Sequence, residues 1–136
     1  MRTAVMVLIA GIIPAAAGAG GVNTGVFCSV DREIAGLMDA WTALESGSYG
    51  SIEASAALLR AESALAMALE SPRDNLPGDA EVKWTDYLKA SADCIFTFRT
   101  AVSGHNGDGT AERLRTSFMR WNDAGMEFMD SVLSTR

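Results

Sequence analysis

Residues 110–132 read TAERLRTSFMRWNDAGMEFMDSV and carry the clearest periodicity of this 136-residue chain. Apolar and small positions there alternate in steps of four and three: Leu114, Phe118, Trp121, Gly125, Phe128 and Val132. That spacing places a single stripe along one face of an α-helix. Thr110 is a suitable N-cap for this helix. Gly125, which lies within the stripe, predicts a close approach by a neighbouring helix.

Two segments upstream repeat this pattern. Residues 24–45 carry a stripe with the same steps: Phe27, Val30, Ile34, Leu37, Trp41 and Leu44. A later helix is expected to follow Asp79 as its N-cap and to end at Gly104. Its apolar stripe consists of Trp84, Leu88, Cys94, Ile95, Phe98 and Val102. Ser91 falls on that stripe, where its hydroxyl can donate to a carbonyl one turn earlier.

The segment from 51 to 70 differs because alanine dominates it. Its large apolar residues are Ile52, Leu58, Leu59, Leu65 and Leu69, and 7 alanines lie among them. Alanine is the strongest helix former, so this segment is predicted to be helical as well. A face of small side chains also lets a neighbouring helix approach closely.

Short connections rich in glycine, proline and serine separate the four segments, at 46–50, 71–79 and 104–109. No segment shows the alternation that is typical of a β-strand. The sequence therefore predicts an all-α, up-down-up-down four-helix bundle over residues 20–136, after an N-terminal signal segment.

The first residues have the features of a secretory signal peptide. Arg2 precedes an uncharged apolar run from Thr3 to Ile13, and residues 17–19 read Ala-Gly-Ala, which fits the site that a signal peptidase cleaves. We expect residues 1–19 to be removed and the bundle to be periplasmic or secreted. Alternatively, residues 3–22 approach the roughly 20 apolar residues that cross a bilayer. If residues 3–22 are retained, they would anchor the bundle to a membrane, with the bundle facing outside the cytoplasm.

The charge balance argues against two classes of partner. Asp and Glu number 17 against 11 Lys and Arg, which gives a net charge of −6. Such a protein repels the phosphates of nucleic acids and of anionic lipids. We expect no nucleic-acid partner, and contact with a membrane only if residues 3–22 are retained.

The two cysteines, Cys28 and Cys94, are predicted to form a disulfide because an exported domain meets oxidising conditions. Their positions oppose this pairing. The helices that carry them run parallel in an up-down bundle, and the two residues differ in level by roughly 15 Å at 1.5 Å per residue. A disulfide needs Cα atoms within about 7 Å. The bridge would require one helix to slide; the alternatives are a buried thiol at Cys94 or an intermolecular bond through Cys28.

The residues that most catalytic and cofactor sites need are missing from the sequence. His105 is the single histidine and lies in a glycine-rich loop, and the chain has neither a Cys-x-x-Cys-His motif nor a Glu-x-x-His pair. Covalent haem, a di-iron centre and zinc therefore have no expected ligand set. We expect no enzyme activity, no catalytic residues, no metal and no cofactor.

Two kinds of binding site remain as hypotheses. The first is a partner-protein surface on the polar face of the last helix, formed by Arg113, Arg115, Arg120, Asp123 and Glu127. The second is a ligand pocket between helices, formed by Trp41, Trp84, Trp121 and Tyr87. On the first hypothesis the protein is a non-catalytic accessory subunit, inhibitor, immunity factor or chaperone of the cell envelope. On the second it binds a small ligand or cofactor; a membrane-anchored accessory subunit is the third possibility.

Overall fold

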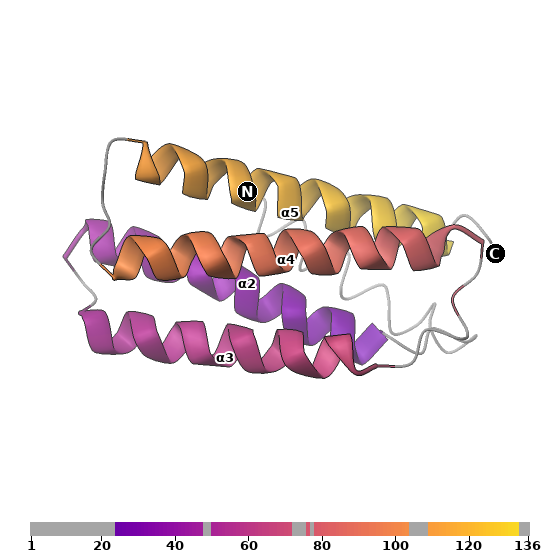
Figure 1. Ribbon diagram of the computed structural model, residues 1–136, viewed down its shortest axis with the longest axis horizontal. Coiled ribbons are helices and arrows are strands. Elements are labelled where there is room, and N and C mark those ends of the chain that lie inside the picture. The colour runs from indigo at the N-terminus through magenta and orange to yellow at the C-terminus, as the bar shows by residue number, and fades with distance from the viewer. Residues whose placement is uncertain (1–23, 48–49, 72–75, 77, 104–108, 134–136) are drawn as a thin grey trace.

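The computed structural model describes residues 24–47, 50–71, 76, 78–103 and 109–133. Four helices occupy them: α2 (Thr24–Glu45), α3 (Ser51–Leu69), α4 (Ala80–Val102) and α5 (Thr110–Leu133). Successive helices lie side by side and run in opposite directions, so α2 is parallel to α4 and α3 to α5 (Figure 1). The predicted all-α four-helix bundle is confirmed. The predicted signal segment and His105 lie outside the described residues.

The helix ends follow local hydrogen bonds. At the start of α3, the Glu53 carboxylate accepts a bond from the Gly50 backbone N–H at 2.9 Å. Asp79 precedes α4 as predicted, but its side chain makes no capping hydrogen bond. The prediction that Thr110 caps the last helix is wrong, because Thr110 is already its first residue. Gly109 precedes it with a φ of +90°, which favours glycine, and its carbonyl accepts the first helical hydrogen bond at 2.9 Å.

Large apolar side chains from α2, α4 and α5 fill the core as the stripes predict. Ten side chains are less than 2% exposed: Trp84, Trp121, Tyr87, Phe27, Phe98, Ile34, Leu37, Leu114, Val30 and Cys94. Ser91 is fully buried among them, and its hydroxyl donates to the Tyr87 carbonyl at 2.9 Å. The bond predicted for Ser91 is therefore confirmed.

Helix α3 is oriented with its small side chains inward. Its buried residues are Ala54, Ala57, Ala61, Ala64 and Ala68. Four of its large side chains point outward, with Ile52 81%, Leu59 64%, Met67 68% and Leu69 56% exposed, whereas Leu58 and Leu65 are partly buried and pack against the core. The close approach through small side chains that the sequence predicts therefore takes place on the side of α3 that faces α2 and α4.

The structure does not join Cys28 to Cys94, so the predicted disulfide is absent. The register of α2 and α4 explains why. A hydrogen bond between Asp31 and Tyr87 places these two residues at one level of the parallel pair. Cys28 lies 3 residues before that level and Cys94 lies 7 residues beyond it, so the thiols are separated along the bundle by about 15 Å. Cys94 is fully buried and its thiol donates to the Ser117 carbonyl at 3.2 Å.

Candidate functional site

The outward side of α3 is an uncharged and mainly apolar strip. We call it the outer α3 face; its exposed members are Ile52, Ser55, Ala56, Leu59, Ser63, Ala66 and Met67. Five of them, Ile52, Ala56, Leu59, Ser63 and Ala66, follow one another in steps of four and three. Residues 52–67 span about 24 Å of helix, and α3 forms one outer edge of the bundle (Figure 1). The outer face of a helix in a globular protein is usually charged, so this strip is unusual.

The two charged side chains that flank the middle of this face, Arg60 and Glu62, are paired within the molecule. On the side of α2, Arg60 pairs with Glu33 at 3.5 Å. On the side of α4, Glu62 pairs with Arg99. The outer α3 face is therefore a neutral strip between two ion pairs, on a protein whose net charge is −6.

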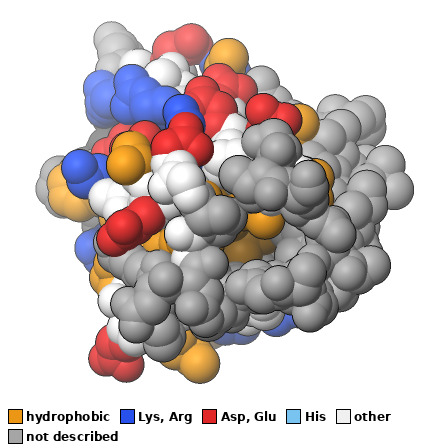
Figure 2. Space-filling model, turned by 90° about the vertical axis from the view of Figure 1, so that its right-hand side faces the viewer, with side chains coloured by type: hydrophobic (Ala, Val, Ile, Leu, Met, Phe, Trp, Pro, Cys, Tyr) orange, Lys and Arg blue, Asp and Glu red, His pale blue; other side chains and the backbone are white. Residues whose placement is uncertain are grey.

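The charged surface lies elsewhere, along the seam between α4 and α5. Lys83 of α4 pairs with Glu127 of α5 at 3.1 Å, and Arg120 of α5 pairs with Asp93 of α4 at 3.4 Å. Figure 2 looks onto the end of the bundle at which α4 begins, and charged side chains gather there over its upper half. Phe96 of α4 is 64% exposed and lies beside charged and hydroxyl side chains on this surface.

The five residues predicted as a partner surface are all exposed, but the structure divides them between two sides of α5. Arg113 and Arg120 border a groove of about 410 Å³ between α4 and α5. Arg115 borders a different pocket, beside α2, and pairs with Glu112 at 2.6 Å. The groove also contains both acidic and basic side chains, so it has no net preference for either charge.

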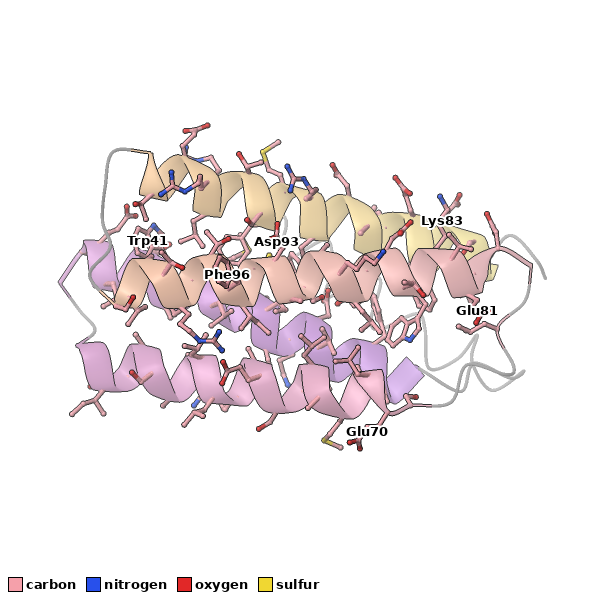
Figure 3. All side chains as sticks on the ribbon, in the orientation of Figure 1. Trp41, Glu70, Glu81, Lys83, Asp93 and Phe96 are labelled. Carbon is pink, nitrogen blue, oxygen red and sulfur yellow. The ribbon has the colours of Figure 1, made fainter. Side chains whose placement is uncertain are left out.

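The four residues predicted as a ligand pocket do not line one cavity. Trp84, Trp121 and Tyr87 are fully buried, and the Trp84 and Tyr87 rings stack with centroids 5.7 Å apart. Trp41 lies near the opposite end of the bundle from Lys83, the neighbour of Trp84 (Figure 3). There it lines a pocket of about 250 Å³ together with residues of α2 and α5.

Asp31 is the acidic residue that sequence reasoning missed. Its side chain is buried between α2 and α4, only 4% exposed, and accepts a hydrogen bond from the Tyr87 hydroxyl at 3.4 Å. Burial raises the pKa of Asp31 to about 7, although the bond from Tyr87 acts in the opposite direction. The signal was present in the sequence, because Asp31 lies midway between Phe27 and Ala35 on the apolar face of its helix.

Aromatic side chains surround the Asp31–Tyr87 pair. The Phe27 ring lies 4.8 Å from Tyr87, and the Trp84 ring lies 5.0 Å from Phe128, centroid to centroid. These rings are in direct contact with one another, which leaves no room between them for a ligand.

Two buried indole groups lack hydrogen-bond partners beside this cluster. They are the Nε1 atoms of Trp84 and Trp121. The Trp121 indole is close enough to Tyr87 to lower the pKa of its phenol, but the contact does not reach hydrogen-bond geometry. Burial is the larger effect and raises the Tyr87 pKa well above its usual value.

Two further properties concern metal binding and membrane insertion. The described residues contain no group of three or more His, Cys, Asp or Glu side chains arranged to hold a metal ion. Among the four helices, none combines the length and the apolar character needed to span a membrane.

Comparisons with protein-family models, with curated proteins and with solved structures found no match.

Proposed function

We propose that this protein is a non-catalytic helical bundle that binds a partner protein through the outer α3 face. One observation carries the proposal: α3 buries five of its seven alanines and exposes Ile52, Leu59 and Met67. Exposing large aliphatic side chains while burying small ones is unfavourable for an isolated bundle. A contiguous exposed apolar strip of this kind is typical of an interaction site.

The occupant that fits this strip is an uncharged apolar helix of the partner. The alternating steps of four and three are the spacing with which two helices interdigitate. Ala56, Ser63 and Ala66 leave gaps in which large side chains of a second helix can lie. The flanking charges are matched within the bundle, so the strip offers no unpaired cation to lipid or nucleic-acid phosphates.

A second copy of the chain is less suitable as the occupant. Self-association would bring together two molecules that each carry a net charge of −6. A partner with a lower negative charge meets less repulsion across the same apolar contact.

The proposed setting is the cell envelope or the exterior of the cell. This part of the proposal rests on the signal-peptide features of residues 1–19. In that setting a small bundle with one apolar docking face suits an accessory subunit, an inhibitor, an immunity factor or a chaperone.

Site-specific photo-crosslinking in the native envelope tests the proposal. A benzophenone side chain is placed at Leu59 on the outer α3 face or, as the matched control, at Asp123 on the exposed side of α5. We expect the Leu59 probe alone to capture a partner, with the crosslinked peptide in an amphipathic helix that has an uncharged apolar face.

Three outcomes would contradict this proposal. Capture from position 123 alone would assign the contact to the polar face of α5. A product of twice the chain mass from position 59 would identify a second copy as the occupant. Crosslinking to lipid alone would identify a membrane surface.

A further inference from the structure

Asp31 is the one charged side chain that the described part of the protein buries. The other buried polar side chains there are hydroxyl groups of serine and threonine. A carboxylate without water around it needs a cation or several hydrogen-bond donors to remain ionised. The groups around Asp31 therefore determine whether its side chain is protonated or ionised in the folded bundle.

The groups that face Asp31 do not supply a cation. Helix α4 contributes Tyr87, whose raised pKa keeps its phenol neutral and whose single bond to Asp31 is long, at 3.4 Å. On α2 itself, Cys28 lies one turn away, and its own pKa is raised by burial and by Asp31. Arg32 is adjacent in sequence, but 72% of its side chain is exposed and it pairs with Glu33.

The remaining elements add no charge either. Among the described residues, no charged group of α3 or α5 shifts the pKa of Asp31. Helix α5 contributes the Trp121 indole to the same cluster, and its N–H lacks a partner, like that of Trp84. Asp31 thus receives one long hydrogen bond, none from either indole N–H and no positive charge, which favours the protonated carboxylic acid.

We propose that Asp31 acts as a proton-dependent latch between α2 and α4, closed when the side chain carries its proton and loosened when the proton passes to solvent. Loosening separates α2, including Phe27, from Tyr87 and Trp84 of α4. The raised pKa of Asp31, about 7, places the change near neutral pH. This inference is independent of the partner-binding proposal, because the outer α3 face does not include α2.

Hydrogen–deuterium exchange of the full chain at pH 5 and pH 8, corrected for intrinsic exchange rates, tests the latch. We expect amides of α2 and α4 to lose about 10- to 100-fold in protection over this range, because the opened state releases the proton. Asp31→Asn, which mimics the neutral acid, should lose this dependence. Asp39→Asn, on the exposed side of the same helix, should retain it.

A second variant keeps the latch testable if Asp31→Asn fails to fold. Tyr87→Phe removes the hydrogen bond that lowers the pKa of Asp31, so the loss of protection should move to higher pH. Amides that exchange only by global unfolding also lose protection as the proton is released; protection of α2 and α4 at pH 8 that is no lower than that of α3 and α5 would therefore indicate global unfolding alone and would overturn the latch. Unchanged protection of α2 between pH 5 and pH 8 would overturn it as well.

Discussion

At the scale of single residues, Asp31 makes the stability of the fold depend on pH. Folding raises its pKa from 3.8 to about 7, so between these values the folded protein keeps a proton that the unfolded chain has released. The free energy of unfolding therefore falls as pH rises through this window, by about 4 kcal/mol in all. Below pH 3.8, the pKa of Asp31 in the unfolded chain, the fold retains all of this stabilisation.

Urea denaturation at pH 5 and pH 8 measures this dependence. We expect Asp31→Asn to remove most of it and to be more stable than the wild-type protein at pH 8. Asp39→Asn is the matched control, because Asp39 is exposed on the same helix. A wild-type protein that gains stability from pH 5 to pH 8 would show that Asp31 is ionised in the fold.

The two thiols should differ in reactivity in the native protein. Cys94 is fully buried, and burial raises its pKa far above the usual value, with Asp93 contributing in the same direction. Cys28 is partly exposed. A thiol reagent at pH 8 should modify Cys28 first and Cys94 only after denaturation. Finding no reactive thiol in the denatured, unreduced protein would mean that the two cysteines are bridged after all.

At the scale of the helix, the inward alanines of α3 set how closely it approaches α2 and α4. Ala61 is 1% exposed, whereas Ala66 is exposed on the outer α3 face. Ala61→Leu should lower the free energy of unfolding by about 1–3 kcal/mol, because the added atoms have no space. Ala66→Leu should change it by less than about 0.5 kcal/mol. Thermal or urea denaturation compares them, and equal effects would contradict the assigned orientation of α3.

The orientation of α3 was also the part of the fold that its sequence left undecided. In α2, α4 and α5, most large apolar residues occupy one stripe, so the buried face could be predicted. In α3, alanines lie on both sides and the large residues Ile52 and Leu59 face outward. The pattern therefore predicted a helix but not which side of it packs inward, and the apolar surface was missed for that reason.

At the scale of the whole molecule, the sequence predicted the number, length and order of the helices, because the stripes and breakers determine them locally. Register between helices depends on packing. The pairing of Asp31 with Tyr87 fixes the register of α2 and α4, and that register separates Cys28 from Cys94. The exposure of Arg113 on α5 could likewise be predicted from its polar face, but its place in the groove beside α4 could not.

We propose above all that the outer α3 face binds a helix of a partner protein. Leu59→Glu places a charge in the middle of this face, at a side chain that is 64% exposed, so the bundle itself should remain folded. The most direct measurement is the Kd of the crosslinked partner for this variant, with circular dichroism to verify folding. We expect binding to be weakened by at least about 30-fold in Leu59→Glu and to remain close to wild type in Asp123→Lys. Wild-type affinity in Leu59→Glu, or a loss confined to Asp123→Lys, would contradict it.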